Sequence, residues 1–177
     1  MSTSRISLRF LLTGSTMTGS SRFLTPLYLK EIAFRASTQT ITARRLFVDL
    51  LFELRNGSLL HSRCLLDSGA PLCVVPFSVH NGQGLSWHSL PGPWPAGFRT
   101  WLGVRCTLGS VNVWLSRPGL PQFHGPIPLI AKFADVDPPN VKPPISVLVG
   151  LNFLADIKAH VNFQFHTPPH GGSIVLP

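Results

Sequence analysis

Residues 64–75 read Cys-Leu-Leu-Asp-Ser-Gly-Ala-Pro-Leu-Cys-Val-Val, an apolar stretch that runs directly into a carboxylate, a hydroxyl and a glycine. Burying a lone Asp between hydrophobic strands costs several kcal/mol unless the carboxylate is hydrogen-bonded or paired. A chain that places Asp67 in this setting is therefore expected to use its carboxylate.

The sequence before Asp67 predicts a β-hairpin. Residues 46–55 carry apolar side chains at every second position, the pattern of a half-buried strand. Asn56-Gly57 then predicts a type I′ turn, in which both central residues have positive φ. Residues 58–66 return as the second strand and place Asp67 at its end.

The stretch around Asp67 resembles the active-site signature of aspartic proteases, in which three apolar residues precede Asp, then Ser or Thr, Gly and Ala. The chain has one such motif, because no other Asp or Glu is followed by Ser-Gly or Thr-Gly. Two-lobed members of the family carry two motifs. A single motif is typical of the half-sized, retropepsin-like branch, in which two identical chains each supply one Asp.

A second resemblance lies at residues 147–157, Val-Leu-Val-Gly-Leu-Asn-Phe-Leu-Ala-Asp-Ile. It is similar to the retropepsin segment in which aliphatic residues and a Gly lead into a short helix and a final strand. Gly150 would allow the backbones of this strand and the catalytic loop to approach closely. Viral members usually have an Arg after this Gly that pairs with an acidic residue near the catalytic loop; here those positions are Leu151 and Pro71.

The resemblance implies an all-β fold, a retropepsin-like closed β-barrel with one short C-terminal helix. It implies an aspartic endopeptidase in which two Asp67 carboxylates of a homodimer share a proton and activate a water molecule. Substrate would be an extended peptide or protein segment, and no cofactor or metal is needed. The residues expected to support the catalytic loop are Ser68, Gly69, Ala70 and Gly150. The alternative is a catalytically silent peptide-binding or assembly module on the same scaffold.

The region between the two motifs is rich in Pro, Gly and Trp. We expect the flap that closes over substrate within residues 85–110, and a surface excursion at residues 118–144, which contain eight prolines. The four tryptophans are expected to pack in the core and flap. The further expected elements are a short strand at 74–77, loops at 81–98, and strands at 100–106 and 110–115 joined by a turn at Leu108-Gly109.

Positive charge is concentrated at the N-terminus. Residues 1–45 hold seven Lys or Arg against one acidic residue, whereas residues 46–177 hold eight against six. We interpret residues 1–45 as a basic, Ser/Thr-rich and poorly ordered extension, with a targeting segment or an upstream strand at residues 23–29 as alternatives. Residues 46–177 would form the protease domain. Nucleic-acid binding is not favoured, since only the N-terminal segment is basic.

Composition is typical of one globular domain: the chain has 177 residues, 44% of them apolar and 12% charged. No run approaches the roughly 18 apolar residues that a membrane helix needs, so no membrane contact is expected. Three cysteines favour reduced thiols in a cytoplasmic compartment, with Cys64 and Cys73 packing as small hydrophobic residues. His160, His166 and His170 lack partners at zinc-ligand spacing, so a metal site is not expected.

Overall fold

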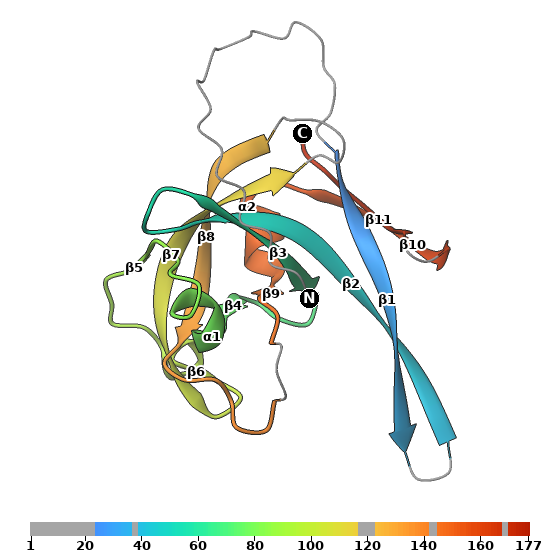
Figure 1. Ribbon diagram of the computed structural model, residues 1–177, viewed down its shortest axis with the longest axis horizontal. Helices are drawn as coiled ribbons and strands as arrows, with labels where there is room; N and C mark the ends of the chain where they lie inside the picture. The colour runs from blue at the N-terminus through green and yellow to red at the C-terminus, as the bar shows by residue number, and fades with distance from the viewer. Residues whose placement is uncertain (1–23, 37–38, 117–122, 142–144, 168–169) are drawn as a thin grey trace, which may run out of the picture.

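Six strands close into a β-barrel around the main hydrophobic core (Figure 1). The structure, a computed structural model, describes residues 24–36, 39–116, 123–141, 145–167 and 170–177. The barrel runs β2-β3-β9-β4-β8-β7 and closes where β7 pairs with β2, Leu50 lying opposite Leu115. The prediction of a mostly β fold with a closed barrel is confirmed.

The described residues form eleven strands, two short α-helices and one 3₁₀ turn. No helix among them is long and apolar enough to span a membrane. In chain order the elements are β1 (Leu24–Ala36), β2 (Gln39–Glu53), β3 (Leu59–Leu66), β4 (Cys73–Val75), α1 (Phe77–His80), β5 (Trp87–Ser89), η1 (Ala96–Phe98), β6 (Thr100–Trp101), β7 (Val104–Ser116), β8 (Phe123–Ala134), β9 (Leu148–Val149), α2 (Leu151–Asp156), β10 (His160–Thr167) and β11 (His170–Val175).

The N-terminal segment contributes to the sheet. β1 pairs with β2 on one side and with β11 on the other, so that the order continues β10-β11-β1-β2 beyond the barrel. Residues 24–36 and 39–45, expected to be poorly ordered, lie in strands, and the upstream strand that was the alternative at residues 23–29 is present from Leu24 onward. Leu27 and Leu29 are buried on β1, which gives this segment the apolar contacts that stabilise a strand. Residues 1–23 lie outside the described part of the chain.

The hairpin before Asp67 is present, but its turn differs from the prediction. β2 and β3 pair from Leu46 opposite Leu66 to Glu53 opposite Leu59. Gly57 has φ of 76°, whereas Asn56 is not in the positive-φ region, so the turn is not type I′. The Asn56 side-chain oxygen instead accepts hydrogen bonds from the Ser58 N–H and hydroxyl, which stabilise the turn locally.

The turn that was predicted at Leu108-Gly109 is wrong, because β7 is continuous over Val104–Ser116. The turn falls at Leu102 and Gly103, with φ of 48° and 80°, and not at residues 108–109. Gly109 lies inside β7. The Trp87 ring and the His88 carbonyl occupy the space that a side chain at residue 109 would need, so glycine serves close packing here and not a turn. The apolar Leu102 at the tip is 63% exposed.

The prolines at residues 118–144 do not prevent a strand. β8 occupies residues 123–134 and contains Pro126 and Pro128. These prolines lie where β8 pairs with β7 alone, since its pairing with β4 covers only residues 131–133. Proline is tolerated there because its missing N–H would face away from the single partner strand.

A short helix that was not predicted, α1, follows β4. Its His80 is buried, with Nε2 2.9 Å from the Ala134 carbonyl oxygen. The imidazole lies edge-on to Trp87 and Phe133, which stack on each other at 4.2 Å. Trp87 is thus a packing residue, as the sequence predicted. The barrel has two short helices where one was expected.

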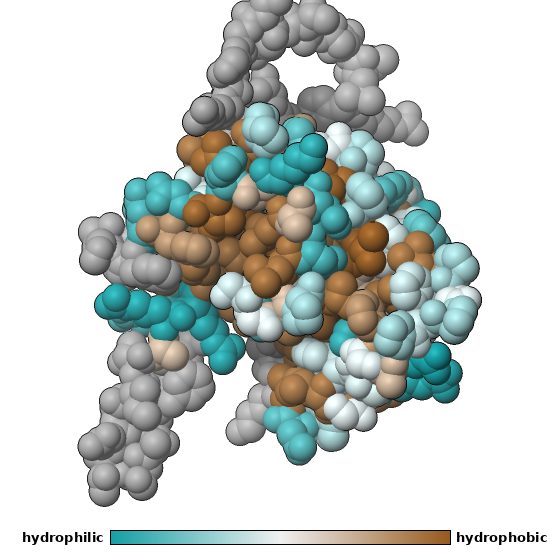
Figure 2. All heavy atoms as spheres, turned by 180° about the vertical axis from the view of Figure 1, so that it is seen from behind, coloured by the Kyte–Doolittle hydropathy of each residue, from teal (hydrophilic) through white to brown (hydrophobic). Residues whose placement is uncertain are grey.

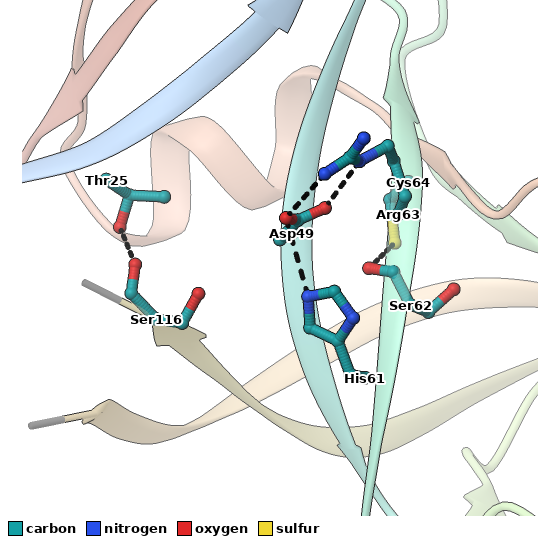
Figure 3. A network of polar contacts seen from close by, with 7 residues as sticks. All are labelled: Thr25, Asp49, His61, Ser62, Arg63, Cys64 and Ser116. Carbon is teal, nitrogen blue, oxygen red and sulfur yellow. Dashed lines mark hydrogen bonds and ion pairs between the residues drawn. The ribbon is translucent and has the colours of Figure 1, made fainter. Parts of the chain in front are cut away.

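An ion pair between a buried carboxylate and a half-exposed guanidinium lies on the hairpin that carries Asp67 (Figure 3). Asp49 on β2 is 6% exposed and accepts two hydrogen bonds from the Arg63 guanidinium on β3, at 2.9 and 3.1 Å. His61 lies 3.4 Å from the same carboxylate. Arg63 also lies over the Tyr28 ring of β1, 4.1 Å from its centroid. The cluster joins three neighbouring strands through one carboxylate.

Burial and the Asp49 carboxylate raise the pKa of Tyr28, because both disfavour the phenolate, while Arg63 lowers it by a smaller amount. Tyr28 is the only tyrosine in the chain, so its ultraviolet titration can be read directly. We expect a midpoint above the ordinary value of about 10. The raised pKa favours folding below pH 10, and this contribution is lost as the pH rises through the folded-state pKa.

The Asp49→Asn variant should lower the Tyr28 midpoint towards the ordinary value, since it removes the negative charge and keeps the shape. His61→Gln is the control and should leave the midpoint near that of the wild type. Far-ultraviolet circular dichroism at each pH confirms that the protein remains folded. A wild-type midpoint at or below the ordinary value would contradict this description of the cluster.

Candidate active site

Asp67 is positioned by parallel pairing between β3 and β9. Leu65 and Leu66 lie opposite Leu148 and Val149 in this pairing. The ladder continues one residue further, because the Asp67 N–H donates to the Val149 carbonyl at 3.0 Å. The backbone of Asp67 is therefore fixed to the barrel, while its side chain, only partly buried, lies at the point where the strand ends.

The residues after Asp67 form a tight turn around its carboxylate. The Gly69 N–H donates to Asp67 Oδ1 at 2.9 Å, and the Ala70 N–H donates to the Asp67 carbonyl at 3.1 Å. A Cβ on residue 69 would lie 3.3 Å from the same Oδ1, so glycine leaves the carboxylate room. Ser68 is exposed beside it. One carboxylate oxygen is thereby oriented by the backbone, an arrangement that preorganises it for chemistry.

The first backbone N–H groups of α2 bind the same loop. The Leu151 N–H donates to the Ala70 carbonyl at 2.9 Å, and the Asn152 N–H donates to the Pro71 carbonyl at 3.2 Å. Helix N-termini leave such donors without intrahelical partners, so the loop satisfies them. The positions that hold an ion pair in viral retropepsins are Pro71 and Leu151 in this chain. The segments that contain them are linked here by main-chain hydrogen bonds.

Gly150 lies close against the backbone of the loop that follows Asp67. A Cβ at this position would lie 2.6 Å from the Leu72 carbonyl carbon and 2.7 Å from the Ala70 carbonyl oxygen. Both are backbone atoms and cannot move aside as a flexible side chain would. All five residues identified from the sequence, Asp67, Ser68, Gly69, Ala70 and Gly150, therefore lie in one loop and the strand end beside it.

We predict that Gly150→Ala displaces the loop and destabilises the protein by about 1–3 kcal/mol, the usual range for overpacking. Chemical denaturation followed by tryptophan fluorescence measures the change in the free energy of unfolding. Gly97→Ala is the matched control, since a Cβ there meets nothing within 4 Å. Equal effects of the two substitutions would show that the close approach at Gly150 is unimportant.

Asn152 is a site residue that the sequence analysis missed. Its Oδ1 accepts hydrogen bonds from the Cys73 N–H at 2.9 Å and from the Cys73 thiol at 3.2 Å. Its Nδ2 donates to the Ile130 carbonyl at 2.8 Å. One amide thus connects α2 to both β4 and β8. The only available signal was an Asn two residues after Gly150.

We predict that Asn152→Ala lowers the free energy of unfolding by about 2–4 kcal/mol, because it leaves a buried N–H and a carbonyl without partners. Asn112→Ala is the control; Asn112 is exposed and bonds only Glu53 in the described contacts, so its loss should cost under about 1 kcal/mol. Urea denaturation of the two variants provides the comparison. A cost at Asn152 no larger than at Asn112 would contradict the bridging role.

The cysteines near the site are buried and free. Cys64 and Cys73 have no exposed surface, as expected for small hydrophobic residues. Burial raises the pKa of the Cys73 thiol to about 11, although the Gly150 N–H, 3.2 Å from Sγ, acts in the opposite direction. Cys73 is therefore a protonated packing residue that also donates to Asn152, and not a nucleophile.

A cavity of about 560 Å³ opens at Asp67 and Ser68. It is lined by apolar residues of the β2–β3 hairpin and of β10, and by two arginines from the start of the hairpin that the sequence analysis did not connect with the site. The lining residues are Arg44, Arg45, Leu46, Leu65, Leu66, Asp67, Ser68 and Phe163. The carboxylate thus faces a space large enough for peptide side chains.

The interval expected to hold the flap contains β5, η1 and β6. β5 pairs with β7, and residues 90–99 lead from β5 to β6. The Leu102-Gly103 turn then joins β6 to β7. The Lys132 ammonium on β8 donates to the carbonyls of Gly97 and Thr100, at 2.6 and 3.0 Å. These bonds hold the loop against the barrel.

Comparison of the chain with models of protein families, with curated proteins and with solved structures finds no match. Within the described residues, no three His, Cys, Asp or Glu side chains are grouped so that they could hold a metal ion.

Proposed function

We propose that this chain is a retropepsin-like aspartic endopeptidase that acts as a homodimer. The observation that carries the proposal is the Asp67 carboxylate, which the Gly69 N–H orients at the mouth of a cavity, on a loop bonded to both β9 and α2. A solvated surface Asp does not require such support. A carboxylate that must hold a water molecule in one position does.

A single chain supplies one carboxylate, so the reaction requires two copies. Two Asp67 side chains that face each other share one proton, because two like charges at close range repel. The ionised carboxylate takes a proton from a water molecule, whose oxygen attacks the peptide carbonyl carbon. The protonated carboxyl donates to the carbonyl oxygen. Breakdown of the tetrahedral species breaks the C–N bond, and the amine leaves with a proton.

Surface features of the chain support pairing with a second copy. β10 is at one end of the strand order in the described sheet, and such an edge can accept a further strand. Phe163 on β10 is 46% exposed and Leu151 at the start of α2 is 47% exposed, both beside the catalytic loop. Figure 2 shows a broad hydrophobic area across the middle of one face. Ser68 is exposed and available to a partner loop.

We predict that Asp67→Asn lowers peptide cleavage by about a thousandfold or more while the fold is kept, since Asn is nearly isosteric and cannot act as the base. The assay uses a diverse peptide pool between roughly pH 4 and 7, where a carboxylate pair can hold one proton. Each protein also passes through a sizing column in the assay buffer. Asp135→Asn, at an exposed ion pair with Arg105, is the control and should keep full activity.

Full activity in Asp67→Asn would show that the catalytic residue lies elsewhere. Absence of cleavage by a wild type that stays monomeric would favour the alternative, a peptide-binding or assembly module on the same barrel. Cleavage by a dimer that is lost only in Asp67→Asn is the result that the proposal expects.

A further inference from the structure

A second cavity lies between the loop that follows β5 and the strand β7. Its volume is about 270 Å³, and it shares no lining residue with the cavity at Asp67. The loop contributes the side chains of Trp94, Phe98 and Arg99, and β7 contributes the buried side chains of Cys106 and Leu108. The cavity therefore combines aromatic, cationic and buried apolar groups.

The aromatic side of this cavity is formed in advance by contacts within the loop. The rings of Trp94 and Phe98 stack with their centroids 6.5 Å apart and their planes at 22°. The Trp94 indole N–H donates to the Leu90 carbonyl at 3.4 Å, and a Cβ on Gly92 would lie 2.9 Å from Trp94 Cδ1, so glycine leaves room for the ring. Phe98 is 36% exposed, which leaves its ring accessible to a ligand. A wall that is already ordered lowers the entropy cost of binding.

The positive charge at the cavity is centred on Arg99. Its Nε donates to the Trp94 carbonyl at 2.8 Å, which orients the guanidinium and leaves its two Nη groups for a ligand. Within the described residues neither Arg99 nor Lys132, which holds the same loop through two carbonyls, has an ion pair. The third cation, Arg105, lies 3.7 Å from Asp135. Three cations against one carboxylate leave the cavity with an excess of positive charge.

We propose that this cavity is a docking site for a peptide segment in which an aromatic side chain is followed by an acidic one. The aromatic side chain packs against the rings of Trp94 and Phe98. The carboxylate accepts two parallel hydrogen bonds from the Nη groups of Arg99. The inference goes beyond the proposed function, because docking at this cavity does not involve Asp67.

The size and the charge of the cavity favour a peptide over a nucleic acid. Pockets for drug-sized ligands measure roughly 300–1,000 Å³, whereas this cavity of about 270 Å³ suits one large side chain of a longer ligand. Single-stranded nucleic acids are bound by a basic groove that follows the backbone and by rings that stack on successive bases. Here the two rings stack on each other, and residues 46–177 hold eight basic and six acidic residues.

The test measures binding to the Asp67→Asn variant of the full chain, so that no peptide is consumed. Three fluorescent peptides share one neutral sequence and differ at two central positions, which hold Phe-Glu, Phe-Gln or Ala-Glu. Anisotropy gives their dissociation constants. We expect the Phe-Glu peptide to bind about tenfold more tightly than either of the others, because each of those lacks one of the two contacts. Equal binding of the three peptides would overturn the inference.

Substitutions at the cavity, added to the Asp67→Asn background, assign the two contacts. Arg99→Gln should remove the preference for Glu over Gln, and Arg99→Lys should retain part of it. Phe98→Ala should reduce the preference for Phe over Ala and leave the preference for Glu. A preference for Glu that survives in Arg99→Gln would contradict the role of Arg99.

Arg55→Gln is the matched control, since Arg55 is exposed at the turn between β2 and β3 and does not line the cavity. It should keep both preferences, and loss of the Glu preference in this variant would show that the selectivity is not specific to the cavity. Circular dichroism confirms that each variant is folded. A single-stranded oligonucleotide that displaces the Phe-Glu peptide and binds more tightly would overturn the peptide assignment in favour of nucleic acid.

Discussion

Gly150 has no side chain, and backbone atoms of the loop after Asp67 occupy the space that a Cβ would need. This close approach lets β9 pair with β3 and lets the first N–H groups of α2 reach the carbonyls of Ala70 and Pro71. The loop that carries Asp67 is therefore bonded on both sides to regular structure. A carboxylate on such a loop has little freedom to move, which is a requirement for positioning a water molecule or a peptide.

Polar side chains add contacts between elements of the barrel beyond the backbone pairing of its strands. Asn152 connects α2 to β4 and β8, and Asp49 connects β2 to β3 through Arg63. Both side chains have partners for their polar atoms, so their burial does not leave an unsatisfied donor or acceptor. The Asp49–Arg63 contact lies within the hairpin that leads to Asp67, and the Asn152 contacts join α2 to the neighbouring strands, so both link the surroundings of Asp67 to the barrel.

Much of the site could be predicted because its signals are local. The alternation of residues 46–55 and the turn residues after them predicted the hairpin, and the motif at Asp67 identified the loop. The hairpin register could also have located Arg45, because extending the pairing of Leu46 with Leu66 by one residue places Arg45 beside Asp67. The basic composition of residues 1–45 suggested an extension instead, and that interpretation left the place of Arg45 in the cavity lining unrecognised.

Local patterns in the chain thus determine the β-hairpin, the carboxylate that follows it, and the short strand and Gly150 that lead into α2. The tertiary structure decides which distant groups surround them. Asn152 meets Cys73 across 79 residues of sequence, and β8 forms despite its prolines because β7 offers a partner on one side. Turn chemistry and alternation act over a few residues, whereas these contacts exist only after the barrel has closed and brought separate strands together.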